Sequence, residues 1–283
     1  MVKVMKKLQI PQPNRTILKW AGSKVRIMNQ LHPHLPKAKR LVEPFAGSCA
    51  VMMNTDYEQY LIADANPDLI NLYETLTILP ESMLIEALPL FRRNNSADYY
   101  LARSEFNDSK QVLSRLRQAS LFLYLNRHCF NGLCRYNQQG KFNVPFGQYK
   151  APYFPKSEID SFCDKAYLTK TQILNLEWQD TLSLVDFSDG VYCDPPYMGG
   201  RDSFTQYHTA GFTNADHEAL AIALKDINDI QGNPITISNS PEAKELYADL
   251  GFTIHEIEAP RSIAGKGKRT PAKEIIAVLA GVN

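Results

Sequence analysis

The sequence predicts an α/β protein in which helices cover both faces of a mainly parallel sheet. Short apolar runs alternate with stretches of helical periodicity, and this alternation is typical of a parallel sheet. The last two apolar runs have no helix between them, so we expect them to form a hairpin at one edge. A long stretch in the middle of the chain breaks the alternation. The 283 residues are 44% hydrophobic, enough for one large or two smaller domains.

The predicted strands are seven apolar runs, at residues 40–45, 59–64, 172–176, 190–194, 234–239, 251–257 and 274–280. Four predicted helices accompany them, at residues 22–31, 67–79, 213–229 and 241–250. Thr213 suits the N-cap of the third helix, and Asp216 stands at the capping-box position three residues later.

The interruption runs from about residue 73 to residue 155. It is largely helical to residue 125 and then becomes rich in Asn and Gly, in the hairpin-like sequence NRHCFNGLCRYNQQGKFNVPFG. We therefore expect residues 1–72 and 156–283 to form one domain. Residues 73–155 form an inserted, mainly helical domain that carries a β-hairpin.

Composition excludes several classes of protein. No apolar run approaches the roughly 18 residues of a membrane span. The basic N-terminal stretch lacks the apolar segment of a signal peptide. Five cysteines without a CxxC pair indicate reduced thiols rather than a disulfide framework or a metal site. We expect a cytoplasmic protein with no membrane segment and no metal.

Charge is unevenly distributed along the chain, although the net charge is only +1. Residues 1–42, 109–157 and 259–273 contain no Asp or Glu and hold most of the Lys and Arg. A positive face beside a negative body suits a polyanion binder. The alternative is a chance clustering of solvated surface charges.

Two predicted strands end in residues that suit a nucleoside cofactor. The first ends in VEPFAGS, where Phe45 and Gly47 lie in a turn that lets a ligand approach the backbone. The second ends at Asp64, which suits the two hydroxyls of a ribose. A solvent-facing Asp that caps the next helix is the alternative. No P-loop is present, which argues against an NTPase.

The fourth strand ends in YCDPPY, where proline must stop the strand because it cannot donate to a sheet. Asp194 and the Pro195 carbonyl then offer acceptors at the strand's carboxyl end, and Tyr197 offers a ring for stacking. Acceptors aimed at the exocyclic amine of adenine would draw its lone pair out of the ring and onto the nitrogen. The nitrogen could then attack a methyl group on a sulfonium, a reaction that needs no metal. The alternative is a rigid surface turn.

These motifs resemble the Dam-type DNA adenine-N6 methyltransferases, which use S-adenosyl-L-methionine. The resemblance extends over nearly the whole chain, through LKWAGSK, VEPFAGS, LIADANPDLINLY, LFLYLNRHCFNGLCRYN, GKFNVPFG, YCDPPY and ISNS in the family's order. The order of motifs is that of the alpha group of amino-methyltransferases. It implies a Rossmann-like methyltransferase sheet in the cofactor-binding catalytic domain, a target-recognition domain at residues 73–155, and a monomer acting on GATC in double-stranded DNA.

The resemblance also implies roles for individual residues. The catalytic residues, which would hold a flipped adenine, are Asp194, Pro195, Pro196 and Tyr197. The cofactor-binding residues are Trp20, Ala21, Gly22, Lys24, Phe45, Gly47, Asp64 and Asp194. The DNA-binding residues are Lys19, Arg127, Phe130, Asn131, Leu133, Arg135, Asn137, Pro145, Tyr149 and Arg261.

Within the hairpin, strand periodicity predicts that Leu133 and Arg135 share one face. We expect Arg135 to read a guanine and Leu133 to contact a thymine methyl group in the major groove. The alternative is that Arg135 contacts phosphate.

Three positions depart from the family pattern. Ser23 replaces a common glycine, Phe130 stands where related enzymes carry tyrosine, and Gln148 replaces a basic residue. Two other functions are alternatives to this one. The intact tetrapeptide, with Asp64 and Trp20, argues against an inactive DNA-binding protein of this fold. An N4-cytosine methyltransferase would more usually carry serine than aspartate in the tetrapeptide. The hairpin suits the reading of duplex DNA, which argues against an RNA methyltransferase.

Overall fold

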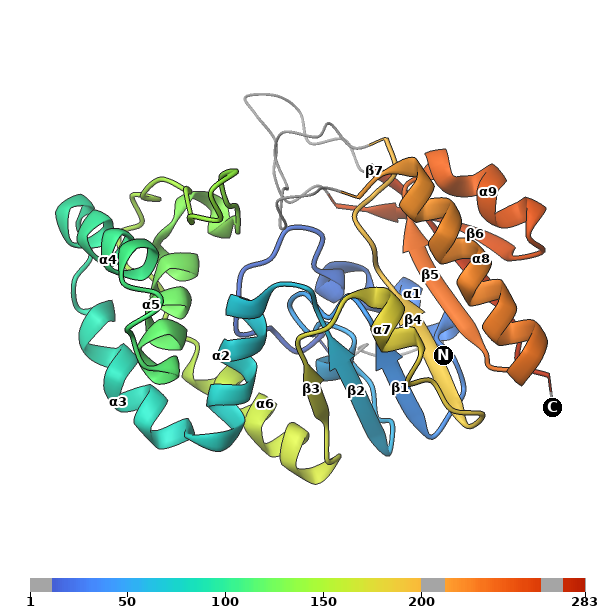
Figure 1. Ribbon diagram of the computed structural model, residues 1–283, viewed down its shortest axis with the longest axis horizontal. Coiled ribbons are helices and arrows are strands. Elements are labelled where there is room, and N and C mark those ends of the chain that lie inside the picture. The colour runs from blue at the N-terminus through green and yellow to red at the C-terminus, as the bar shows by residue number, and fades with distance from the viewer. Residues whose placement is uncertain (1–11, 200–211, 261–271, 283) are drawn as a thin grey trace, which may run out of the picture.

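A seven-stranded sheet forms the centre of the protein in a computed structural model, which describes residues 12–199, 212–260 and 272–282 (Figure 1). The strand order is β3-β2-β1-β4-β5-β7-β6. The first five of these strands are parallel, and β7 is antiparallel to both of its neighbours. The strands are β1 (Arg40–Glu43), β2 (Gln59–Ala63), β3 (Gln172–Leu174), β4 (Asp189–Cys193), β5 (Ile235–Asn239), β6 (Thr253–Ala259) and β7 (Ala272–Leu279).

The predicted strands are confirmed to within about two residues at each end. The predicted hairpin is also confirmed, because β6 and β7 pair with each other at one edge of the sheet. The helices are α1 (Met28–Leu31), α2 (Pro67–Ile78), α3 (Pro80–Phe91), α4 (Ser96–Asp108), α5 (Arg115–His128), α6 (Lys156–Leu168), α7 (Trp178–Leu182), α8 (Asn214–Gln231) and α9 (Lys244–Asp249).

Local capping explains where two of these helices begin. Thr213 caps α8, and its hydroxyl and the Asp216 side chain form the reciprocal capping box that the sequence predicted. Asn66 caps α2, where its side chain accepts from the amides of Asp68 and Leu69. The α2 cap places the turn after β2 in a fixed conformation.

The two faces of the sheet bury different hydrophobic clusters, because neighbouring strand residues point to opposite faces. Val42 and Leu61 pack on the side that α8 covers. Leu41 and Ile62 pack on the other side, in a cluster that continues into α3, α4 and α5. The inserted helices stand to one side of the sheet in Figure 1 and share this core with it. The expected division at residues 72 and 156 stays a prediction.

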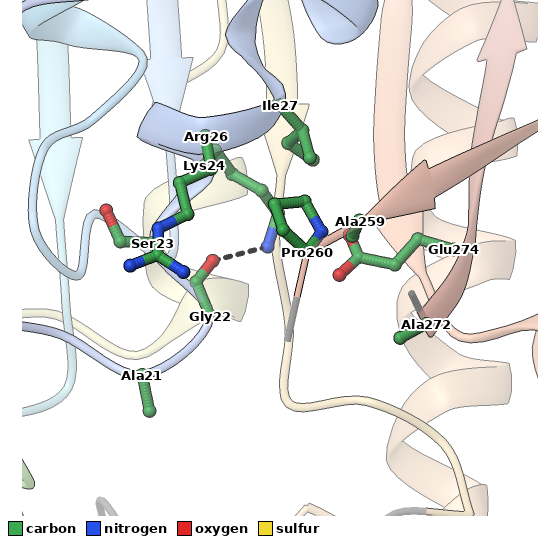
Figure 2. Close-up of a pocket in the computed structure, with 10 residues that line it drawn as sticks. All are labelled: Ala21, Gly22, Ser23, Lys24, Arg26, Ile27, Ala259, Pro260, Ala272 and Glu274. Atoms are coloured by element: carbon green, nitrogen blue, oxygen red, sulfur yellow. Dashed lines mark hydrogen bonds between the residues drawn. The ribbon is translucent and has the colours of Figure 1, made fainter. Parts of the chain in front are cut away.

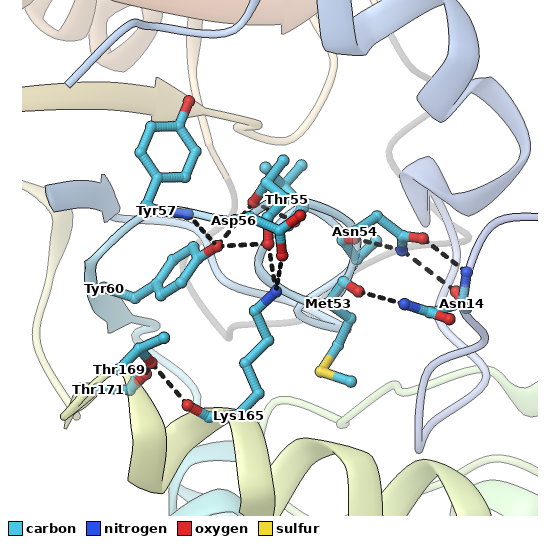
Figure 3. A network of polar contacts seen from close by, with 12 residues as sticks. Asn14, Met53, Asn54, Thr55, Asp56, Tyr57, Tyr60, Lys165, Thr169 and Thr171 are labelled. Carbon is cyan, nitrogen blue, oxygen red and sulfur yellow. Dashed lines mark hydrogen bonds and ion pairs between the residues drawn. The ribbon is translucent and has the colours of Figure 1, made fainter. Parts of the chain in front are cut away.

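A polar network fastens α6, the helix that follows the insertion, to the loop before β2 (Figure 3). The Lys165 ammonium group on α6 donates to the Thr55 carbonyl oxygen and lies 3.4 Å from an oxygen of Asp56. The Tyr60 hydroxyl on β2 donates to the same Thr55 carbonyl at 2.7 Å. The loop before β2 therefore holds α6, which returns the chain to the sheet.

The Asn/Gly-rich segment folds back on itself without regular strands. Its antiparallel pairing consists of two isolated bridges, Cys129 with Phe146 and Tyr136 with Phe142. Asn137 closes the turn that joins Tyr136 to Phe142, and its side-chain oxygen accepts from the amides of Gln139 and Lys141 at 3.0 Å each. We call residues 129–146 the hairpin segment.

Candidate active site

The carboxyl ends of β1, β2 and β4 meet at one edge of the sheet, because these strands are parallel neighbours. Each end supplies an acidic residue. Glu43 is the last residue of β1, Asp64 directly follows β2, and Asp194 directly follows β4. This edge of an open α/β sheet is where ligands bind.

Asp64 shapes the turn that follows β1. One carboxylate oxygen accepts from the Gly47 amide at 3.0 Å, and the other accepts from the Asn66 amide at 2.9 Å. Gly47 has a φ of 47°, and a Cβ built on it would lie 2.9 Å from the indole nitrogen of Trp20. The structure therefore brings Asp64, Gly47 and Trp20 together, as the sequence predicted.

Asp194 is held from two sides. The Lys24 ammonium group lies 2.7 Å from one carboxylate oxygen, and the Ser238 hydroxyl donates to the other at 2.8 Å. Lys24 is buried and also donates to the Gly22 carbonyl at 2.7 Å. Ser238 lies on β5, next to β4. Because both contacts act on one carboxylate, Asp194 has a fixed orientation.

Tyr197 is positioned by a residue that sequence reasoning missed. Its hydroxyl donates to Glu274 on β7 at 2.6 Å, and the Lys24 ammonium lies 5.0 Å from the ring centroid. Burial, with the negative charges of Asp194 and Glu274, raises the pKa of Tyr197, so the phenol stays a neutral donor. Lys24 and Glu274 also line a pocket of about 210 Å³ beside this contact, shown in Figure 2.

Glu43 is the second residue that sequence reasoning missed. It is 2% exposed, and its Oε1 atom has no hydrogen-bond partner among the described residues. Burial, together with the charge of Asp194, raises the pKa of its carboxyl to about 8. An acid that ends a strand of apolar residues was the available indication, and its burial shows that the side chain does not face solvent.

Lys19 and Tyr149, both predicted to contact DNA, lie together. The Lys19 ammonium is 3.8 Å from the centroid of the Tyr149 ring. Burial and the nearby charge of Arg127 lower the pKa of Lys19. The backbone amide of Lys19 donates to Asn126 at 3.0 Å, so the segment before α1 is fixed against the end of α5.

Several residues of the hairpin segment are open to a partner. Phe130 is 50% exposed, Asn131 is exposed with a φ of 56°, and Pro145 is exposed. Arg135 is partly exposed, and its Nε donates to the Asn143 side chain at 2.7 Å. This set therefore remains compatible with contact to DNA.

Three residues predicted to bind DNA are used internally. Arg127 is 7% exposed and donates to the carbonyl oxygens of Tyr153 and Ile17. Leu133 is 6% exposed and belongs to the core, and the Asn137 side chain closes the turn. Irregular pairing in the hairpin segment explains why Leu133 and Arg135 do not share an exposed face. Arg261 lies outside the described residues.

The basic segment at residues 109–157 does not form a free positive face. Most of its cations pair with acids that come from other parts of the chain or adjoin it. The ion pairs are Lys110–Asp68, Arg115–Glu74, Arg117–Glu86, Arg117–Glu105, Lys141–Asp108 and Lys156–Asp160. Charge segregation along the sequence is therefore weaker support for a polyanion partner than it first appeared.

The described part of the chain holds no group of three or more His, Cys, Asp or Glu residues arranged to bind a metal ion. Within the same residues, no helix has the length and apolar character needed to cross a membrane.

Comparisons with known proteins identify the family of this chain. Residues 20–263 match the family model of D12 class N6 adenine-specific DNA methyltransferases. The chain is 48% identical over 267 residues to the retron Ec67 DNA adenine methylase of Escherichia coli, covering 93% of this chain and 90% of that protein. It is 44% identical to the DNA adenine methylase of Serratia marcescens over 89% of this chain and 93% of the relative.

The corresponding figures for the DNA adenine methylase of Escherichia coli strain K12 are 40% identity over 94% of this chain and 95% of the relative. These matches favour an adenine-specific DNA enzyme over an RNA or N4-cytosine methyltransferase and over an inactive binding protein. With the acidic strand ends, they establish that the chain belongs to the D12 class N6 adenine-specific DNA methyltransferases.

Proposed function

We propose that the protein transfers a methyl group from S-adenosyl-L-methionine to N6 of adenine, within GATC in double-stranded DNA. The observation that carries this proposal is the fixed Asp194 carboxylate, held by Lys24 and Ser238 at the same edge of the sheet as Asp64, with β1 between their two strands. The family supplies the reaction on adenine in DNA. The donor and the target sequence are our proposals.

The residues at this edge fit S-adenosyl-L-methionine. Asp64 and the Gly47 turn offer acceptors and close backbone approach for a ribose, beside the Trp20 indole. Glu43 Oε1 has no hydrogen-bond partner among the described residues and could accept from the ammonium group of the cofactor's amino-acid part. That contact would offset the cost of burying the Glu43 carboxylate. When bound, the cofactor supplies an electrophilic methyl group on its sulfonium.

The residues of the tetrapeptide then act on the adenine. Asp194 and the Pro195 carbonyl accept hydrogen bonds from the N6 amine, which draws that nitrogen towards tetrahedral geometry and frees its lone pair. Asp194 need not be a strong base, because the nitrogen becomes acidic only after it is methylated. Tyr197, held by Glu274, stacks on the base. The adenine must leave the duplex to reach these groups.

The proposed DNA-contacting residues are those that remain exposed or partly exposed near the hairpin segment. They are Lys19, Phe130, Asn131, Arg135, Pro145 and Tyr149, and Arg261 is proposed from the sequence alone. Arg127, Leu133 and Asn137 are not carried forward, because their side chains serve the fold. That the protein acts as a monomer and in the cytoplasm stays a prediction.

Calorimetric titration with S-adenosyl-L-methionine tests the cofactor part of the proposal. We expect Asp64→Ala to weaken binding at least tenfold, because the mutation removes the ribose acceptor and the Gly47 contact. Glu58→Ala is the matched control, since it removes an exposed acid from the loop before the same strand. Equal affinity in the wild type and Asp64→Ala, or no binding by the wild type, would show that the pocket is wrongly assigned.

A further inference from the structure

Asp68 is a buried carboxylate that the proposed reaction does not use. It is 4% exposed and lies in the first turn of α2, four residues after Asp64. One oxygen accepts from the Tyr136 hydroxyl at 2.7 Å, and the other lies 2.5 Å from the Lys110 ammonium group. Tyr136 belongs to the hairpin segment, so Asp68 joins that segment to the turn that follows β2.

A second contact joins the same two segments. Asn66 is 2% exposed, and its amide nitrogen donates to the Cys134 sulfur at 3.7 Å. The Asn66 backbone amide in turn donates to the carboxylate of Asp64 at 2.9 Å. The turn between β2 and α2 therefore contacts both the proposed cofactor site and the hairpin segment.

Cys134 and Tyr136, which contact Asn66 and Asp68, flank Arg135. Cys134 and Tyr136 are 2% and 9% exposed, whereas Arg135 between them is partly exposed. The side chains of Cys134 and Tyr136 are anchored in the interior, and the Arg135 side chain between them stays partly exposed. The position of Arg135 thus depends on what holds its two neighbours, in addition to its own hydrogen bond to Asn143.

The hairpin segment has few backbone contacts that fix this position from within. Around Arg135 its pairing consists of one bridge, Tyr136 with Phe142, and backbone hydrogen bonds from Asn143 to Arg135 at 3.0 Å and from Asn137 to Lys141 at 2.9 Å. The Arg135 Nε also donates to the Asn143 side chain at 2.7 Å. An isolated two-stranded hairpin is marginally stable at best. A charge-assisted hydrogen bond to a buried carboxylate is among the stronger contacts available to it.

We propose that Asp68, acting through the Tyr136 hydroxyl, is a positioning residue that sets where Arg135 meets the DNA and so contributes to sequence discrimination. The inference rests on the proposed role of the hairpin segment in reading DNA. Asp68 touches neither cofactor nor substrate. Its effect is on the ratio of rates between target and altered sites rather than on the methyl-transfer step itself.

The test compares Tyr136→Phe with Tyr124→Phe. Both substitutions remove one hydroxyl from a buried tyrosine, but the Tyr124 hydroxyl donates to the Arg93 carbonyl at 2.8 Å, within the inserted helices. kcat/KM is measured on a GATC duplex and on duplexes altered at one outer base pair. We expect the ratio to fall about fivefold to tenfold in Tyr136→Phe and to keep its wild-type value in Tyr124→Phe. An unchanged ratio in Tyr136→Phe, or an equal fall in both variants, would overturn the proposal.

Two variants of Asp68 give an independent measurement, should Tyr136→Phe fold poorly. Asp68→Asn keeps an acceptor for the Tyr136 hydroxyl, so we expect it to keep most of the discrimination that Asp68→Ala loses. Equal ratios in these two variants would contradict the positioning role.

Arg135→Ala separates this proposal from the function on which it rests. An unchanged ratio in Arg135→Ala would show that Arg135 does not read a base, which would overturn the proposed role of the hairpin segment. A reduced ratio in Arg135→Ala with an unchanged ratio in Tyr136→Phe would overturn the role of Asp68 alone.

Discussion

Replacing Glu43 by glutamine should stabilise the fold at neutral and alkaline pH while weakening the cofactor site. The carboxyl is buried beside Asp194, and its pKa is raised from 4.5 to about 8. A raised pKa means that the folded state binds a proton that the unfolded chain has already released. The contribution of Glu43 to the free energy of unfolding therefore falls as pH rises between 4.5 and about 8.

The size of the effect follows from the two pKa values. Each unit of difference is worth about 1.4 kcal/mol, so Glu43 removes roughly 3–4 kcal/mol of stability between pH 5 and pH 8. Glutamine cannot ionise, and it is close in size to the neutral carboxyl that the folded state prefers. The variant should match the wild type near pH 5 and exceed it by up to this amount at pH 8.

Urea denaturation of both proteins from pH 5 to pH 8.5 measures this difference directly. The same samples give the affinity for S-adenosyl-L-methionine, which should rise with pH in the wild type because its ammonium group favours the ionised carboxylate. In Glu43→Gln the affinity should be lower and should lose this component of its pH dependence. Parallel stability curves for the two proteins would refute the assignment of Glu43 as a buried, protonated acid.

Three further predictions concern other residues. Asp194→Ala should slow single-turnover methyl transfer at least about a hundredfold while DNA affinity stays within a few-fold, because the lost acceptor acts on the reacting amine; a wild-type rate would exclude that role. Gly47→Ala should weaken cofactor binding in calorimetry, since its Cβ would meet the Trp20 indole at 2.9 Å and the φ of 47° disfavours alanine; unchanged affinity would contradict the close approach. Thr213→Ala should lower the free energy of unfolding by about 1 kcal/mol through loss of the α8 cap, and urea denaturation without a shift in midpoint would contradict that cap.

The sheet was predictable because its determinants are local. Apolar runs such as 190–194 end at proline or turn residues, and parallel pairing then brings their carboxyl ends to one edge. Asp64 and Asp194 could be assigned to the site on these grounds alone. The Thr213 cap was predictable for the same reason, since both partners lie within one turn of helix.

Long-range pairing was not predictable from the sequence. The acid-free run at residues 109–157 suggested a positive face, but acids such as Asp68 and Glu74 reach its cations from α2. Simple alternation failed at Leu133 because the hairpin segment has isolated bridges instead of a regular ladder. Glu274 lies in no motif, and Glu43 lies in VEPFAGS without a role assigned from the sequence, so only their surroundings in the structure reveal them.

Methylation of a plasmid by the purified protein with labelled S-adenosyl-L-methionine tests the central proposal most directly. The product is digested with one endonuclease that cuts only methylated GATC and one that cuts only unmethylated GATC. The proposed function predicts label at N6 of adenine, cleavage by the first endonuclease and protection from the second. Label incorporated at adenines outside GATC, with GATC sites left unmethylated, would contradict the proposed target, and no transfer from this donor would contradict the proposed cofactor.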